Sequence, residues 1–175
     1  ETGQRNNTIV VFTSDHGDMT GDHGLRLKGC RFYEALVRVP LILSYPDQFK
    51  QGLQSSALVE LVDIVPTLLE IADLPIPETM QGQSLLPILT GSTNADYHRD
   101  SVRSEYCKVL SGTESYATMI RDQRYKLINY HGHELGELFD LEHDPGEFDN
   151  LWTNSDYREI RFRLMQQNFD ALAFA

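Results

Sequence analysis

Residues 8–43 limit the fold of this chain more than any other stretch of its sequence. Two apolar runs, residues 9–12 and 37–43, lie on either side of a segment that is dense in Asp, His, Gly and Lys. The first run is β-branched and aromatic, without polar alternation, which is typical of a strand buried on both faces. The second run predicts another such strand, although Pro40 limits its place in a sheet. A buried parallel strand that ends in residues 14–17 would deliver polar side chains to the sheet edge where α/β proteins bind ligands.

The composition allows a folded domain and excludes some classes of partner. The 175 residues suit one domain or one and a half, and 41% of them are hydrophobic, which is enough for a core. The formal net charge of −11 argues against nucleic acid as a partner. It leaves an anionic substrate open, because a metal ion and a few cations reverse the field locally. We expect no membrane span, because no apolar run reaches the roughly 18 residues that one needs.

The cysteine content leaves the cellular compartment open. Cys30 and Cys107 are the two cysteines of the chain, which is too few for a disulfide framework. A periplasmic, a secreted and a cytoplasmic bacterial protein are therefore all compatible with the sequence.

The loop between the two apolar runs has the composition of a cation site. Asp15 and His16 cannot point the same way from a regular strand, but they can converge on one ion where the strand ends and the backbone turns. Asp18, Asp22 and His23 follow in the same loop. This mixture of acids and histidines suggests a hard divalent cation with oxygen ligands, Ca²⁺ or Mg²⁺. Because loop acids are most often solvated, we expect Asp18 and Asp22 to be solvated rather than ligands.

Other charged residues have a functional and an ordinary interpretation. Lys28 lies just after the loop, where a lysine is a point charge suited to a phosphate or sulfate oxygen. The alternative is a surface lysine, the usual fate of this residue type. His131 and His133 occupy a later turn and could suggest a metal, but we expect them to be solvated.

The remainder of the chain predicts helices first and short strands afterwards. Apolar residues at helical spacing predict a helix over residues 56–72, and a short helix is expected at 84–89. The later elements are expected to be strands at 101–105, 115–121, 125–130 and 137–140, of which the second and third form a hairpin. A helix is expected over 156–173, with Asp156 as its N-cap. One face of this helix would carry Ile160, Leu164, Phe169 and Leu172. Such a run of strands suggests a small antiparallel sheet beside the main one.

A series of short motifs stands in order along the chain. They are residues 13–17 (TSDHG), 21–24 (GDHG), 28–29 (KG), 32–34 (FYE), 37–42 (VRVPLI), 62–69 (VDIVPTLL), 82–87 (GQSLLP), 124–128 (RYKLI) and 137–147 (ELFDLEHDPGE). In this order they resemble the C-terminal portion of the sulfatase family, in the alkaline-phosphatase-like superfamily. The resemblance implies an α/β fold, part of a mixed sheet flanked by helices. Residues 4–95 would complete the catalytic domain, and residues 96–175 would form an α+β subdomain with a small antiparallel sheet and a terminal helix.

The resemblance also implies a sulfuric ester hydrolase and roles for four residues. Asp15 and His16 occupy the positions of two metal ligands, usually to Ca²⁺. Mg²⁺ and Mn²⁺ are the alternatives, and an imidazole ligand slightly favours a more borderline metal such as Mn²⁺. Lys28 matches the lysine that contacts the sulfate group. His23 lies in a loop that borders the substrate in relatives, so we expect it to contact the substrate and to protonate the leaving alcohol. The substrate would be a sulfated small molecule or carbohydrate.

One motif of the family is missing from this sequence. Sulfatases carry Cys- or Ser-x-Pro-x-Arg near the N-terminus, and its first residue becomes the formylglycine nucleophile. Neither Cys30 nor Cys107 stands in such a motif. The resemblance therefore implies that the nucleophile and the other metal ligands come from the N-terminal portion of the same enzyme, and that this chain is inactive alone. Two alternatives stay open, a phosphonate or phosphate ester hydrolase of the same superfamily and a non-catalytic binding module.

Overall fold

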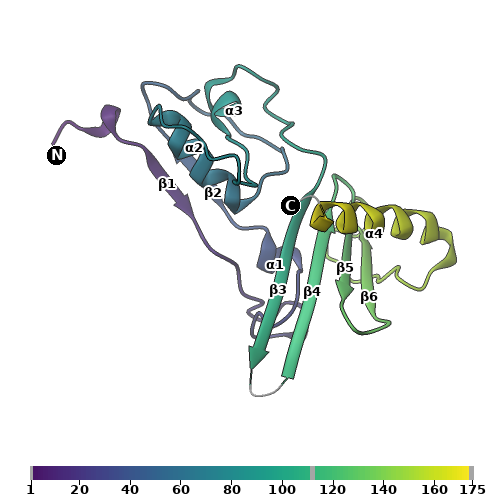
Figure 1. Ribbon diagram of the computed structural model, residues 1–175. Coiled ribbons are helices and arrows are strands. Elements are labelled where there is room, and N and C mark those ends of the chain that lie inside the picture. The colour runs from purple at the N-terminus through teal and green to yellow at the C-terminus, as the bar shows by residue number, and fades with distance from the viewer. Residues whose placement is uncertain (1, 111–112, 174–175) are drawn as a thin grey trace. The chain divides into compact units, whose positions relative to one another are not determined.

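The computed structural model describes residues 2–110 and 113–173, and the chain divides into two compact units. Unit 1 consists of Glu1–Asp15 and Val39–Asp100, and unit 2 consists of His16–Arg38 and Ser101–Ala175. Each unit thus joins two stretches that are distant in the sequence; Figure 1 labels their helices and strands. The sequence-based division into residues 4–95 and 96–175 stays a prediction, because compactness alone does not show which parts fold independently.

Unit 1 contains a two-stranded sheet whose strands run antiparallel. Strand β1, Val10–Thr13, pairs with β2, Leu41–Ser44, so that Phe12 lies opposite Ile42. The prediction of a parallel strand buried on both faces was wrong for the described residues, since Phe12 and Ile42 are each 58% exposed. The second strand also starts later than predicted, because helix α1 (Glu34–Val37) takes up the beginning of the second apolar run.

The main helix of unit 1 starts later than the apolar pattern predicts. In place of a helix over residues 56–72, a 3-10 helix at Leu61–Asp63 leads into α2, Ile64–Ile71. The side chains of Glu60 and Asp63 form a reciprocal capping box, which sets the start of the helical run. The other helices of this unit are a 3-10 helix at Arg5–Asn7 and α3 at Leu86–Thr90, where a short helix is predicted.

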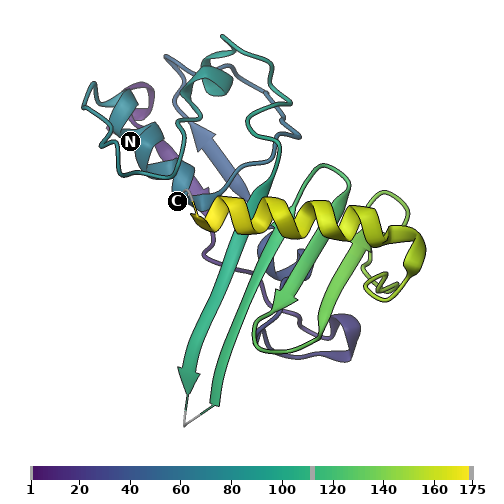
Figure 2. The same cartoon turned by 45° about the vertical axis from the view of Figure 1, so that its right-hand side comes forward.

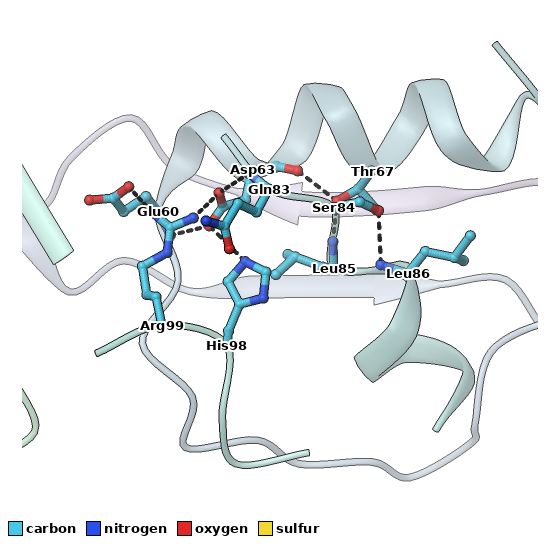
Figure 3. Close-up of polar contacts among 9 residues, drawn as sticks. All are labelled: Glu60, Asp63, Thr67, Gln83, Ser84, Leu85, Leu86, His98 and Arg99. Atoms are coloured by element: carbon cyan, nitrogen blue, oxygen red, sulfur yellow. Dashed lines mark hydrogen bonds and ion pairs between the residues drawn. The ribbon is translucent and has the colours of Figure 1, made fainter. Parts of the chain in front are cut away.

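A buried carboxylate ties the segments of unit 1 together, as Figure 3 shows. Asp63 is fully buried and accepts hydrogen bonds from the backbone N–H groups of Glu60 and Gln83, each at 2.8 Å. The guanidinium of Arg99 forms ion pairs with both Asp63 and Glu60. Because a buried charge needs partners, this cluster fixes the three segments against one another.

The apolar core of unit 1 does not come from its two strands. The hydroxyl of Thr67, in α2, donates to the backbone oxygen of Asp63 at 2.6 Å and accepts from the N–H of Leu85 at 2.8 Å, so that α2 is joined to the chain entering α3 (Figure 3). The buried apolar side chains around these helices and loops are Phe49, Leu58, Leu85 and Ile88.

Unit 2 is built on a four-stranded antiparallel sheet in which sequential strands are neighbours. Its strands are β3 (Val102–Leu110), β4 (Thr113–Arg121), β5 (Tyr125–Tyr130) and β6 (Gly136–Asp140). The structure confirms the hairpin predicted from residues 115–121 and 125–130 and the strand predicted at 137–140. The first strand is longer than the predicted 101–105, because its pairing with β4 continues along the whole of β3.

Helix α4, Arg158–Ala173, covers one face of this sheet. Figure 2 shows it lying across the strands. Its Leu164 is fully buried and packs with the side chains of Ile120, Leu127 and Leu138, one from each of β4, β5 and β6.

The opposite face of the sheet carries residues 16–38. Phe32 of this segment packs with a cluster of strand residues. Its strand members are Ala117, Met119, Ile128 and Phe139. Successive strand residues point to opposite faces of the sheet. Met119, Ile128 and Phe139 therefore lie on the face away from α4, next in sequence to Ile120, Leu127 and Leu138. The sheet therefore supports a helix on one side and the Asp- and His-rich segment on the other.

Two details of α4 differ from the sequence-based expectation. The cap is Asn154, whose side chain accepts a hydrogen bond from the N–H of Asp156, so Asp156 lies inside a 3-10 helix (Ser155–Tyr157) that precedes α4. The predicted apolar face is only partly buried, since Leu164 is buried and Phe169 is exposed. Five residues correspond to about 1.4 helical turns, which places these two side chains on different sides of the helix.

The helices of residues 2–110 and 113–173 include none that is both long enough and apolar enough to cross a membrane.

We predict that Leu164→Ala destabilises unit 2 and that Phe169→Ala, on the same helix, does not. Truncating a fully buried leucine costs about 2–5 kcal/mol of the free energy of unfolding. Phe169 is 70% exposed, so its truncation should cost less than about 0.5 kcal/mol. Urea unfolding can be followed by the fluorescence of Trp152, the single tryptophan, which packs against the Leu164 cluster. Equal losses in the two variants would contradict this packing.

Candidate functional site

Three of the four residues predicted to form a site lie on one segment of unit 2. His16, His23 and Lys28 belong to residues 16–38, whereas Asp15 is the last residue of the first stretch of unit 1. The segment contains two short helices, a 3-10 helix at Asp22–Gly24 and α1 at Glu34–Val37.

The start of the segment is held against α1 by its backbone. The N–H of Gly17 donates to the carbonyl oxygen of Leu36 at 2.8 Å. A Cβ atom at position 17 would lie 1.9 Å from the carbonyl oxygen of Ala35, so the position has room only for glycine. This close approach fixes the backbone that immediately follows His16.

The two ring nitrogens of His16 have different neighbours. Nδ1 lies 2.7 Å from the carbonyl oxygen of Gly17, and Nε2 contacts Nζ of Lys28. A proton assigned to Nδ1 is donated to Gly17, which leaves the lone pair of Nε2 facing Lys28. Metal-binding histidines commonly donate their second N–H to a backbone carbonyl in this way. In this structure the Nε2 lone pair accepts from the ammonium group of Lys28, so the role of His16 as a metal ligand stays a prediction.

The acidic residues of the loop make local hydrogen bonds. Asp15 is exposed and accepts a hydrogen bond from the hydroxyl of Ser14 at 3.4 Å. Asp18 and Asp22 are also exposed, and each accepts from the N–H of the residue that follows it, at 3.0 Å. Their exposure agrees with the expectation that they are solvated. Because Asp15 and His16 fall in different units, their joint role as metal ligands stays a prediction.

The imidazole of His23 is oriented by aromatic stacking. Its ring stacks on Tyr33, with centroids 4.1 Å apart and planes at 18°, and on Phe148, at 4.6 Å and 23°. The backbone of His23 is left-handed, with φ of 49°. No local motif connects Phe148 to His23, because the two residues are far apart in the sequence. The structure thus holds the predicted proton donor in a defined orientation.

A small cavity in unit 2 is formed by residues that no sequence motif connects. Burial raises the pKa of Glu137, although a hydrogen bond from Tyr130 opposes the rise. Burial also raises the pKa of Tyr130 and of the Cys30 thiol. His131, one of the two later histidines, is hydrogen-bonded to a threonine of the sheet. The cavity, of about 110 Å³, is lined by Cys30, Ser115, Tyr116, Tyr130 and His133.

A second cluster has the composition of a metal site but is occupied by an arginine. Ligand atoms of Asp140, Glu142 and His143 lie within 4.8 Å of one another. Arg124 donates to both carboxylate oxygens of Asp140, at 2.9 and 2.7 Å. This bidentate pairing lowers the pKa of Asp140 to about 2, with a further hydrogen bond from His143. We therefore interpret the cluster as a structural ion pair that stabilises the turn after β6.

Comparison with known proteins decides the family. Residues 21–173 match the family described as N-sulphoglucosamine sulphohydrolase, C-terminal. The chain belongs to this family. The matched range includes His23 and Lys28 and the whole sheet of unit 2. The resemblance to the C-terminal portion of a sulfatase is thereby confirmed.

Individual relatives of this sulphohydrolase-family chain are similar over almost its whole length. An N-acetylglucosamine-6-O-sulfatase of Bacteroides thetaiotaomicron is 37% identical over 168 residues, which cover 94% of this chain and 30% of the relative. A protein solved in complex with its substrate D-glucosamine-2-N,6-O-disulfate has a TM-score of 0.86 and 32% identity, over 97% of this chain and 35% of that chain. A phosphonate monoester hydrolase of Silicibacter pomeroyi has a TM-score of 0.86 and 28% identity, with the same coverage of 97% and 35%. The chain therefore spans about a third of the length of these relatives.

We predict that Gly17→Ala breaks the attachment of residues 16–18 to α1. The added methyl group meets a backbone oxygen, which cannot rotate away as the end of a side chain can. Loss of the Gly17–Leu36 hydrogen bond should raise amide hydrogen exchange around residue 17 by about 10-fold. Gly132→Ala is the control, because a Cβ there meets open space and the change introduces only left-handed strain. Unchanged exchange around residue 17 in Gly17→Ala would contradict the assigned contact.

Proposed function

We propose that this chain is the C-terminal part of a sulfatase that hydrolyses sulfate esters with a divalent metal ion and a formylglycine nucleophile. Membership of the N-sulphoglucosamine sulphohydrolase C-terminal family supports the class of reaction. The contact between Nζ of Lys28 and Nε2 of His16 is the observation that carries the proposal. It brings a cation suited to sulfate and a nitrogen suited to a metal together on one segment.

Lys28 would stabilise the charge that develops during ester cleavage. Breaking the ester bond leaves negative charge on the sulfate oxygens and on the departing oxygen. A pre-placed ammonium group stabilises that charge in the transition state, and one well-aimed donor is worth about 10²–10³ in rate. The side chain of Lys28 is exposed, so a substrate can reach it.

Asp15 and His16 would hold the metal ion. The fit at His16 rests on its Nδ1 contact with the Gly17 carbonyl, which leaves Nε2 as the donor atom. The ammonium of Lys28, which contacts Nε2 in this structure, would move from Nε2 to the sulfate group when the ion binds. Asp15 adds the hard oxygen donor that Ca²⁺ prefers, with Mg²⁺ or Mn²⁺ as alternatives. When bound, the ion would neutralise the sulfate group and orient it for attack.

His23 would protonate the departing alcohol. A general acid needs a fixed direction toward the leaving oxygen, and the stacking on Tyr33 and Phe148 supplies such a fixed ring. The same ring would contact the bound substrate, as the sequence resemblance implies.

The nucleophile and the other metal ligands would come from the N-terminal portion of the same enzyme. A two-stranded sheet is marginal by itself, and the β1–β2 sheet leaves Phe12 and Ile42 exposed. Additional strands from the N-terminal portion would cover these side chains. The chain alone is then expected to be inactive. A sulfated carbohydrate or small molecule is the proposed substrate, which the disulfated glucosamine bound by one relative supports.

A phosphonate or phosphate ester hydrolase is the second candidate. The phosphonate monoester hydrolase of Silicibacter pomeroyi superposes as well as the disulfate-binding relative does, with a TM-score of 0.86 for each. A metal ion beside a lysine suits both anions. The sequence identity of 32% to the disulfate-binding relative and 28% to the hydrolase favours the sulfatase.

We predict that Lys28→Ala in the full-length enzyme lowers kcat/KM for an aryl sulfate by about 10²–10³, because the transition state loses its ammonium contact. Arg26→Ala is the matched control, since Arg26 is an exposed cation of the same loop. The control should retain nearly full activity, because an exposed charge that is not aimed at the substrate is screened by solvent and salt. Similar losses in the two variants would contradict a specific role for Lys28, and unchanged activity in both would exclude it from the reaction. A full-length wild type without any activity would favour a non-catalytic binding module.

We predict that His23→Ala slows the hydrolysis of esters with poor leaving groups more than that of esters with good ones. A leaving group of low pKa departs without protonation, so it does not need the imidazole. The measurement is the slope of log kcat/KM against leaving-group pKa for a series of aryl sulfates. Phe148→Ala, which removes one stacking partner and keeps the imidazole, should give an intermediate slope. Parallel slopes in wild type and His23→Ala would exclude the acid role.

A further inference from the structure

A lysine in the middle of β5 is completely buried. Lys126 has no exposed side-chain surface, and its Nζ lies 2.9 Å from the carbonyl oxygen of Phe32, 2.8 Å from Oε1 of Glu147 and 2.5 Å from Oε1 of Glu34. An ammonium group has three N–H donors, and three acceptors surround this one. Two of the three acceptors belong to residues 32–34, on the segment that carries His16 and Lys28.

Glu147 completes the arrangement with its second oxygen. Its Oε2 accepts a hydrogen bond from the backbone N–H of Glu34 at 2.6 Å. Glu34 is the first residue of α1, which has no capping hydrogen bond from its own N-cap side chain. A helix of four residues is not stable by itself, so its position depends on bonds from outside. We call Lys126, Glu34 and Glu147 the Lys126 clamp.

The clamp holds the element to which both ends of the candidate site are attached. On one side, the carbonyl oxygen of Leu36 in α1 accepts a hydrogen bond from the N–H of Gly17, the residue that follows His16. On the other side, Lys28 precedes the clamped Phe32 by four residues. The contact between Nζ of Lys28 and Nε2 of His16 therefore joins two residues that are both attached to α1 or to the chain just before it.

The buried charges of the Lys126 clamp require that the backbone at residues 32–34 lie in one defined position. A buried ion pair is often no more stabilising than apolar residues of the same size, but it requires directed contacts. Here the directed contacts end on one backbone carbonyl and one backbone N–H of the segment. Arg121 adds a second cation, with Nε 3.9 Å from Oε1 of Glu34.

We propose that Lys126 and Glu147 are positioning residues for Lys28, acting through the backbone of Phe32 and Glu34. They touch no reacting atom. Their contribution is to keep the ammonium of Lys28 where the transferred sulfate group arrives, so this inference rests on the proposed sulfatase function.

The test is a double-mutant cycle in the full-length enzyme. Glu147→Gln keeps the shape of the side chain but removes its charge, and a displacement of about 1 Å at a site can cost up to about 100-fold in rate. We expect kcat for an aryl sulfate to fall by about 10-fold to 100-fold at a temperature where circular dichroism shows the full-length enzyme folded. Amide exchange around residues 17 and 34 should rise in parallel. In a Lys28→Ala background the same change should lower kcat by less than about 3-fold, because coupled residues are not additive.

Two controls separate positioning from general stability. Arg99→Met breaks a comparable cluster of one cation and two carboxylates in unit 1, and it should lower thermal stability without changing kcat of the folded fraction. Glu34→Gln is a milder change within the clamp, in case Glu147→Gln does not fold, and it should give a smaller loss of the same kind.

The outcomes distinguish the inference from the function on which it rests. Equal losses from Glu147→Gln in the wild-type and Lys28→Ala backgrounds would overturn the positioning role. So would a loss that matches that of Arg99→Met. If Lys28→Ala itself leaves kcat unchanged, the proposed function fails first.

Discussion

The buried ammonium of Lys126 is the interaction on which the candidate site depends. It joins the middle of β5, the turn after β6 and the start of α1 at a single atom. Removing one partner from such a buried pair costs about 3–5 kcal/mol, because the remaining charge is left unpaired. The four-residue helix α1 in turn positions Gly17, and through it His16. The antiparallel sheet of unit 2 is thus connected to His16 through the contacts of Lys126 and the Gly17–Leu36 hydrogen bond.

The chain has a complete core in unit 2 and an incomplete sheet in unit 1. Leu164 and Phe32 lie on opposite faces of the four-stranded sheet and are both buried. In unit 1, the paired residues Phe12 and Ile42 are exposed instead. The chain spans 30% of the length of the N-acetylglucosamine-6-O-sulfatase that it resembles. These observations support the proposal that the chain contributes one wall of an active site and that the nucleophile comes from elsewhere in the enzyme.

Local patterns in the sequence predicted elements well, but contacts between distant residues were beyond them. Alternation and turn residues were enough for the β4–β5 hairpin and for β6, because both signals lie within a few residues. The direction of β2 relative to β1 depends on the path of the intervening chain, which no local pattern records. The motifs placed Lys28 and His16 in one loop, but not their mutual contact. The buried state of Lys126 was missed because a lysine within a strand is normally exposed.

The most direct test of the account compares two anions in the full-length enzyme. The measurement is kcat/KM for 4-nitrophenyl sulfate and for 4-nitrophenyl phenylphosphonate, which share a leaving group, together with the mass of the peptide that contains the nucleophile. A sulfatase with a formylglycine nucleophile should give a higher kcat/KM for the sulfate and a mass that shows formylglycine. A higher kcat/KM for the phosphonate, or an unmodified nucleophile in an enzyme that cleaves the sulfate, would contradict the proposed function.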